Sequence, residues 1–337
     1  VHRDPSARYQ VHPILHQYAA EKLGGIPQQE AEIRDRHSDY FLAFLRNREA
    51  TLKSPGQIEA MKEIDAEIQN VRTAWRRAVD QARVAGIRGA APSLWLFYDM
   101  QSTNEEGERA FAQAVAMLEA EAGQSVEADV ALGLALAFQA WFCSYRVCLE
   151  EGAVLVRRSL EILRRVGAQK ELGLALSFGF NLGAVENVTE AENRLQESLA
   201  IHEELGGRWE TAFTLLQFSL SLVISWPSIL DSEPYLQESY AISREIGDRW
   251  GMANSASVRL YEFGAHRESM QELQESLAVY HEIGDRRSIQ FLLDAMGYRA
   301  RESGQYREAR QLHRESLEIA SEIGDRLGVA GSLDNLG

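Results

Sequence analysis

Apolar residues recur every three or four positions along most of the chain, which is the spacing of one face of an α-helix. In the stretch 286–302, four residues share such a face: Ile289, Leu292, Leu293 and Met296. The stretch 305–323 carries a second apolar face, and Gly304 separates the two because glycine adopts positive φ at low cost. The pattern predicts a helix–turn–helix unit that must stack on a neighbour to cover its apolar face.

A short phrase recurs along the chain and divides it into such units. A serine precedes a glycine by eight positions in five copies, which are Ser159 with Gly167, Ser198 with Gly206, Ser239 with Gly247, Ser276 with Gly284 and Ser316 with Gly324. A fainter copy without the serine ends at Gly123. The interval between these glycines is about 40 residues, which is typical of stacked-repeat proteins. We expect each glycine to end a helix in the left-handed conformation, and Asp325 to cap the helix that follows it.

The periodicity predicts an all-α protein of paired helices. The expected pairs are 93–101 with 105–122, 126–145 with 149–166, 169–184 with 189–205, 208–225 with 232–246, 249–263 with 266–283, and 286–302 with 305–323. Two helices at 28–48 and 57–84 are expected before them, and an unpaired helix from residue 327 after them. Pro13 is expected in the first turn of a short N-terminal helix, and Trp226-Pro227 in an irregular turn between paired helices.

One unit also carries residues in a known order. Six positions stand where tetratricopeptide repeats keep Leu-Gly, Gly, Tyr, Ala and a final small residue or leucine: Met296, Gly297, Gly304, Tyr306, Ala309 and Leu317. The unit resembles the longer variety of this repeat that is found in large bacterial signalling proteins. The resemblance implies a right-handed superhelical solenoid in which the first helix of each pair lines a concave groove.

The N-terminal residues resemble a different element. Six positions match the last strand and helix of the winged-helix module of STAND signal-transduction ATPases of the NB-ARC type: Tyr9, Val11, His12, Leu15, Tyr18 and Ala19. Pro13 stands where that family usually has Asp. The stretches 36–41 and 64–78 resemble the segment that joins this module to the repeats. We therefore expect a winged-helix remnant at 1–24, linker helices at 25–87, and repeats at 88–337, with both chain ends inside a longer protein.

The same resemblance assigns a role in nucleotide sensing to His12, since the family's histidine reaches the bound phosphates. A surface or capping histidine is the alternative, and we favour it because the sequence has no Gly-rich phosphate loop. We expect no cofactor here, and ATP or ADP with magnesium only where an NTPase domain is joined to this region. No catalytic or metal-binding constellation of residues stands out, so the chain is not expected to be an enzyme.

Composition narrows the choice of partners. The 337 residues carry a net charge of −15, which argues against direct nucleic acid binding because phosphates require a basic surface. Two cysteines, Cys143 and Cys148, supply neither a disulfide framework nor a zinc site. We find no signal peptide and no apolar run long enough to span a membrane, and we expect a cytoplasmic protein.

Binding in the groove is the favoured chemistry. Placing the first helices by the repeat pattern puts eight residues near the concave surface: Trp141, Tyr145, Phe180, Gln217, Tyr261, Asp294, Tyr298 and Arg301. Aromatic side chains suit a protein or peptide ligand because they contribute a large contact area with few rotamers to fix. The alternative for any of the eight is packing between repeats, which is also the expectation for Trp209 and Trp250.

Three functions stay open. The first is a sensor region that recognises a protein, a peptide or a small effector and relays binding through residues 28–85 to an upstream nucleotide switch. The second is a free-standing scaffold for protein–protein interactions, and the third is the sensor part of a transcription regulator. We expect no membrane partner, and oligomers only in an activated full-length protein.

Overall fold

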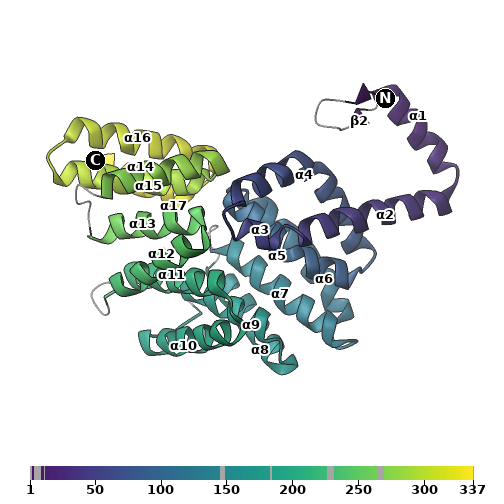
Figure 1. Cartoon of the computed structure of the whole chain (residues 1–337), viewed down its shortest axis with the longest axis horizontal. Helices are drawn as coiled ribbons and strands as arrows, with labels where there is room; N and C mark the ends of the chain where they lie inside the picture. The colour runs from purple at the N-terminus through teal and green to yellow at the C-terminus, as the bar shows by residue number, and fades with distance from the viewer. Residues whose placement is uncertain are drawn as a thin grey trace.

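The structure, a computed structural model, describes residues 2–3, 9–10, 12–144, 149–182, 184–225, 231–263 and 269–336. A two-stranded antiparallel hairpin opens the chain, with β1 (His2–Arg3) paired to β2 (Tyr9–Gln10). All other elements in the described residues are helices, so the all-α prediction is confirmed (Figure 1).

The helices follow one another with short connections. In chain order they are α1 (Pro13–Gly24), α2 (Pro27–Arg46), α3 (Glu49–Leu52), α4 (Gln57–Asp80), α5 (Val84–Met100), α6 (Asn104–Glu121), α7 (Val126–Cys143), α8 (Leu149–Val166), α9 (Gln169–Phe178), the 3-10 turn η1 (Gly179–Asn181), α10 (Val188–Leu205), α11 (Arg208–Ser225), α12 (Glu233–Ile246), α13 (Arg249–Phe263), α14 (Ser269–Ile283), α15 (Arg286–Glu302), α16 (Tyr306–Ile323) and α17 (Arg326–Leu336).

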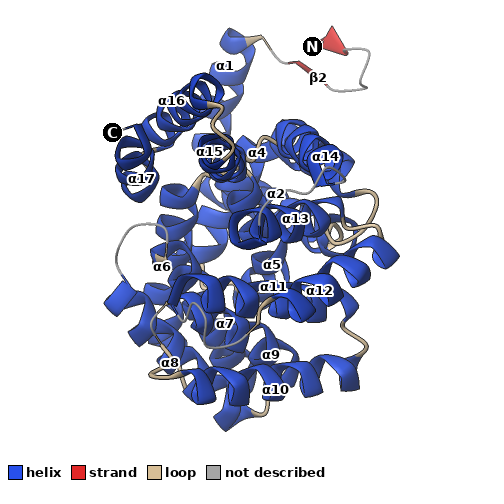
Figure 2. Ribbon diagram, turned by 90° about the vertical axis from the view of Figure 1, so that its left-hand side faces the viewer, coloured by secondary structure: helices blue, strands red, loops and turns tan. Residues whose placement is uncertain are grey.

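These helices form a stack of antiparallel pairs. Each first helix contacts its own second helix and the first helix of the next pair, so that α7, α9, α11, α13, α15 and α17 form one continuous layer (Figure 2). The pairs agree closely with those predicted by the apolar spacing. A repeat-like architecture of consecutively packed helix pairs is therefore present.

Backbone geometry explains the glycines of the recurring phrase. The six glycines at the ends of second helices all adopt positive φ: Gly123, Gly167, Gly206, Gly247, Gly284 and Gly324. After the last of them, the Asp325 carboxylate accepts a hydrogen bond from the Gly328 amide, 3.1 Å away. The expected helix stop and cap are thus both formed.

The serine of the phrase joins the two helices of a pair. The Ser198 hydroxyl donates to the Gly173 carbonyl at 2.9 Å, and Ser239 donates to Ala212 at 2.8 Å. Ser159 and Ser316 make the equivalent bonds, whereas Ser276 donates to Glu272 of its own helix. A small residue allows the helices to approach closely, and its hydroxyl satisfies its own hydrogen-bonding need.

Some boundaries differ from the prediction. Helix α5 begins at Val84 and runs through Pro92 instead of starting after it. Proline inside a helix costs roughly 3 kcal/mol, but nearly all of α5 beyond Ile87 is buried, and this packing outweighs the local preference. Helix α4 ends at Asp80, and the expected irregular turn at Trp226-Pro227 lies outside the described residues.

The stack curves enough for its start to touch its later pairs. Pro55, between α3 and α4, lies against Gly247 in the turn that follows the fourth pair, α11 and α12. The Gln101 side chain, after α5, donates to the Ile283 carbonyl at 2.8 Å. Helix α4 also contacts α14. Helices α2 to α4 therefore lie beside the repeats rather than leading away from them.

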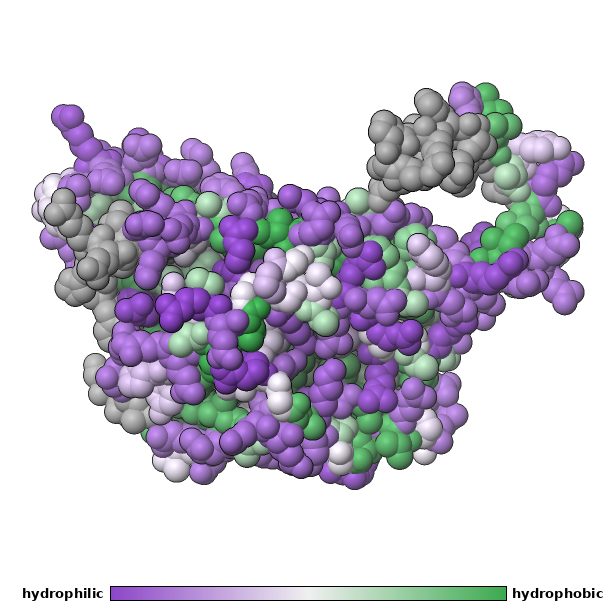
Figure 3. Space-filling model, viewed as in Figure 1, coloured by the Kyte–Doolittle hydropathy of each residue, from purple (hydrophilic) through white to green (hydrophobic). Residues whose placement is uncertain are grey.

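The hairpin and α1 stand away from this body (Figure 1). Ile14, Leu15 and Tyr18 of α1 are exposed, and the space-filling view shows hydrophobic side chains along this arm while most of the visible body is hydrophilic (Figure 3). Helix α7 is long and apolar enough to cross a membrane, but nearly all of its residues are buried among neighbouring helices. Its composition is accounted for by its place in the core.

Candidate ligand-binding groove

A groove of about 430 Å³ opens on the layer of first helices. Its lining comes from α5, α7, α11, α13, α15 and α17, which belong to successive pairs of the stack. One end is apolar and formed by α11, while the other end, formed by α15 and α17, carries most of the polar residues. Since several elements share it, its shape depends on how the pairs stack.

Three of the eight predicted residues line this groove, and each is held by a polar partner. Trp141 donates from its indole nitrogen to Asp99 at 2.8 Å. The Gln217 side-chain oxygen accepts from Asn181 at 2.9 Å. Asp294 lies 2.8 Å from the His313 ring.

The other predicted residues lie elsewhere. Phe180 is fully buried against Phe218 in a separate apolar cluster, as the packing alternative anticipated. Tyr298 and Arg301 lie on an exposed part of α15, with the guanidinium 4.9 Å from the tyrosine ring. Tyr145 lies outside the described residues, and so does the side chain of Tyr261.

His12 occupies the position before α1, and its ring nitrogen accepts from the Ile14 amide at 3.3 Å. It is exposed there. This placement fits the capping role that was the alternative to nucleotide sensing.

Two groove residues that directly follow recurring glycines were not predicted as groove residues from the sequence. Asp285 follows Gly284 and Asp325 follows Gly324, and both cap first helices at the rim of the groove. Their position in the phrase was a usable signal, because a residue that starts each first helix must lie at the edge of the layer. Burial raises the pKa of Asp285, although donors from Trp250, Ser288 and Ser102 oppose the shift.

The neighbouring part of the same layer is closed by aromatic rings. Trp95 of α5 is completely buried and stacks on Phe138 at a centroid distance of 5.0 Å. Four further rings surround it: Trp141, Phe178, Trp209 and Phe213. Trp209 is thus a packing residue, as expected. Most of the groove lining therefore comes from the later pairs, on α11, α13, α15 and α17.

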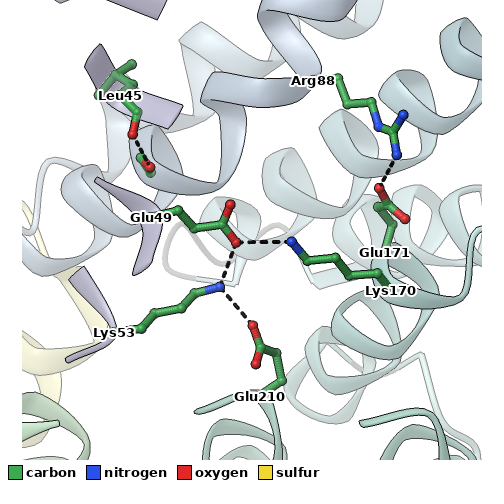
Figure 4. A network of polar contacts seen from close by, with 8 residues as sticks. Leu45, Glu49, Lys53, Arg88, Lys170, Glu171 and Glu210 are labelled. Atoms are coloured by element: carbon green, nitrogen blue, oxygen red, sulfur yellow. Dashed lines mark hydrogen bonds and ion pairs between the residues drawn. The ribbon is translucent and has the colours of Figure 1, made fainter. Parts of the chain in front are cut away.

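Two contacts join the segment between α3 and α4 to the repeats. The first contact centres on the Lys53 ammonium, which lies 2.9 Å from Glu49 and 2.8 Å from Glu210 at the start of α11 (Figure 4). Lys170 lies 3.4 Å from the same Glu49 carboxylate. The Lys53 ammonium is also 4.7 Å from the centre of the Trp209 ring.

Electrostatics keep this contact ionised. Burial alone would lower the pKa of Lys53, but Glu210 and Glu49 outweigh it and raise the value. Burial likewise opposes ionisation of Glu210 and Glu49, and the attraction of Lys53 lowers both carboxyl pKa values nonetheless. A buried cation with two anions is stabilising only while both partners stay charged.

The second contact is made by Gln57, which is almost fully buried. Its amide nitrogen donates to Asp248 at 3.0 Å, and its oxygen accepts from the Trp250 backbone amide at 3.1 Å. The Trp250 side chain lines the groove and donates to Asp285 at 2.8 Å. One chain of hydrogen bonds therefore connects the linker turn with the groove rim.

The Asp294–His313 pair lies between α15 and α16. The His313 ring is buried against Gly297, so the Asp294–His313 pair joins two helices. Within the described residues no group of three potential metal ligands comes together. No protein-family model matches the chain, and no curated protein is significantly similar to it.

Proposed function

We propose that this chain is the ligand-recognition region of a STAND signal-transduction ATPase of the NB-ARC type. Its groove takes up a protein, peptide or small effector, and the linker helices transmit occupancy to a nucleotide switch. In this proposal the helix pairs are tetratricopeptide-like repeats in a right-handed superhelix, and residues 1–24 belong to a winged-helix module.

Several features support the repeat assignment. Gly297 lies against His313 of the paired helix, where any side chain would collide with the ring. Ala309, at the repeat's small position, is buried between the helices of its pair. The continuous layer of first helices is the surface on which repeats of this kind hold extended ligands.

The single observation that carries the sensing proposal is the position of Trp250. Its backbone bonds to Gln57 of the linker while its ring lines the groove. A ligand that contacts this ring can change the stability of the Gln57 contact, because both depend on the same residue. Such differential interaction is what a relay requires.

The arm formed by α1 and the start of α2 supports an upstream partner domain. Its exposed apolar residues are Ile14, Leu15, Tyr18, Ile26 and Ile33. Clustered apolar residues of this kind are typical of surfaces that contact another domain. An NTPase domain packed there would lie on the same helix, α2, that packs against α4 and α5.

Phage display of random peptides of roughly 12 residues against the immobilised chain tests ligand recognition. Gly331→Leu is the counter-selection target, because Gly331 lines the groove and a β-carbon there would meet no atom within 4 Å. Enriched peptides should bind the unmodified chain and fail to bind the variant. Enrichment that survives Gly331→Leu, or no enrichment, would exclude this groove as a peptide sensor.

Hydrogen exchange tests the relay with one of the enriched peptides. Amides of residues 52–60, around Gln57, should change protection on binding, while those of α8, remote from the groove lining, should not. Unchanged exchange at 52–60 would favour the free-standing scaffold. A phosphate loop encoded upstream of Val1 favours the sensor, and the chain itself should give no heat when titrated with ATP and magnesium.

A further inference from the structure

The charges lining the groove are strongly unbalanced. Among the described residues, four aspartates line it, Asp99, Asp285, Asp294 and Asp325, against one arginine, Arg287. Asp294 exposes 22% of its side chain, and Asp325 is also partly exposed. These two carboxylates are therefore the ones that a ligand in the groove can reach directly.

The opposite end of the groove is apolar. Leu216, Leu220, Val223 and Ile224 of α11 all line it, and Ile224 exposes 65% of its surface. Val258 of α13 continues this wall. A small cation such as a polyamine would satisfy the carboxylates and leave this wall uncovered, so the ligand must carry apolar groups as well.

The lining also includes three aromatic residues. Trp141, Trp250 and Phe291 line the groove, and aromatic faces attract ammonium and guanidinium groups as well as apolar side chains. The two tryptophans direct their indole N–H groups to Asp99 and Asp285. These bonds fix the rings before any ligand arrives, which lowers the entropy that binding would cost.

The wall formed by α17 is open because it is built from glycine. A β-carbon at Gly331 would meet no atom within 4 Å, although the residue lines the groove. Ser332, its neighbour, is buried against Ser316 at 2.9 Å and holds α17 in place. Space is therefore open at Gly331 although α17 itself is held in place by its neighbour.

We propose that the groove binds a basic peptide segment in which lysine or arginine side chains pair with Asp294 and Asp325 while apolar side chains cover the α11 wall. The inference rests on the proposed function and specifies its ligand. Charge complementarity selects this occupant, because an acidic or phosphorylated segment would be repelled by the two reachable carboxylates, Asp294 and Asp325. The aromatic rings strengthen the selection of cations.

Two fluorescent peptides of roughly 12 residues test this assignment, one alternating leucine with arginine and one alternating leucine with glutamate. Binding is measured by fluorescence anisotropy at about 50 and 300 mM salt. The arginine peptide should bind, and more weakly at the higher salt, whereas the glutamate peptide should not. Gly331→Leu should abolish binding.

Matched variants assign the charges. Asp325→Asn keeps the cap on α17 because asparagine caps as well as aspartate, and Asp294→Asn keeps an acceptor for His313 and Asn335. Each exposed ion pair is worth at most about 5-fold in affinity, so the double variant should bind the arginine peptide roughly 10-fold more weakly. Gly331→Lys, which removes no contact, should weaken binding at least as much.

Three results would overturn the inference. Groove-dependent binding of the glutamate peptide alone would leave the sensor proposal standing and reverse the charge of its ligand. Arginine-peptide binding unchanged by Gly331→Leu would place the contact on the acidic outer surface and count against both proposals. A dimer that Gly331→Leu dissociates in analytical ultracentrifugation would identify a second copy of the chain as the occupant.

Discussion

The early and late helix pairs have the same architecture, but the layer formed by their first helices differs between them. Around Trp95 that layer is filled by aromatic rings from α5, α7, α9 and α11. Around Asp294 it carries aspartates, serines and glycines and stays open. The stacking of the helices depends on the contacts within and between pairs. The layer of first helices can therefore form either a core or a binding surface.

The comparison extends to what lies against each half. The N-terminal segment contacts both halves at the ends of their helices. Lys53 pairs with Glu210 at the start of α11, and Gln57 and Gln101 bond to Asp248 and Ile283 in the later pairs. A stacked-repeat protein can thus hold its linker at the turns between pairs and keep part of the inner layer open for a ligand.

Trp95→Ala should have the largest effect on stability. The ring is completely buried and contacts five others, so its removal should lower the free energy of unfolding by about 3–5 kcal/mol. Phe291→Ala, in the open half, should cost less than about 1.5 kcal/mol because that ring is only partly buried. Urea denaturation of both variants measures the difference.

Trp95→Phe sharpens the same experiment. The Trp95 indole nitrogen finds no hydrogen-bond partner among the residues that the structure describes, so phenylalanine removes an unsatisfied polar group along with part of the ring. It should cost much less than alanine. Equal losses for Trp95→Ala and Phe291→Ala would show that the two halves are equally packed.

Lys53→Met should weaken the docking of the linker. It leaves the buried Glu210 carboxylate unpaired, whereas Glu49 retains Lys170, and we expect a loss of roughly 2–3 kcal/mol. Adding Glu210→Leu should recover most of this loss, since replacing both ions by apolar groups is often neutral. Urea denaturation of the single and double variants provides the test, and a further loss in the double variant would contradict it.

The same contact predicts a smaller, pH-dependent effect. Lys53 lowers the pKa of Glu210 from its ordinary value of 4.5, so the stability from this group is complete above that value and is lost as pH falls through the lowered pKa. Lys53, with its raised pKa, loses its contribution only above pH 10.5. Melting temperatures of the unmodified chain and Glu210→Gln should therefore differ at pH 7 and converge only below pH 4.5.

Two nearby groups also titrate. Burial raises the pKa of Asp248, which Gln57 contacts, and this contribution cancels in the difference. Burial lowers the pKa of His202 and the Glu210 carboxylate opposes that shift, so the contribution of His202 differs between the two proteins. Convergence already at pH 5 would show that Glu210 is not held ionised by Lys53.

Much of the fold could be predicted from the sequence because it is local. Helix spacing, left-handed glycines and the Asp325 cap each depend on residues within about ten positions of one another. The start of α5 could not, since only burial against other pairs explains why the helix passes through Pro92. The hydrogen bond from Gln57 to Asp248 joins residues far apart in the chain, and no local sequence pattern predicts it.

The groove shows the same limit. Trp141, Gln217 and Asp294 could be placed on the inner layer by counting along first helices. Whether a residue on that layer is covered depends on which other helix lies over it, and Phe180 illustrates the case in which it is buried. Asp325 was predicted only as a helix cap, and neither Asp285 nor Asp325 was assigned to the groove. A residue that caps a first helix also lies at the rim of the layer that these helices form.

The smallest expected effect comes from Gly331→Ala, and its sign separates the two halves of the comparison. Glycine inside a helix is less stable than alanine by up to about 1 kcal/mol. An added β-carbon at Gly331 meets no atom within 4 Å, so the variant should gain roughly 0.5–1 kcal/mol in free energy of unfolding, measured by thermal denaturation.

Gly328→Ala is the matched control on the same helix, because its β-carbon would lie 2.7 Å from the Asp325 carboxylate that caps α17. That variant should lose stability, since the cap must move. A gain at Gly331 together with weaker binding of the arginine peptide would mean that the open wall of the groove is maintained at the expense of helix stability, as expected of a binding surface and not of a core. A loss at both glycines would mean that α17 packs too closely for an open groove.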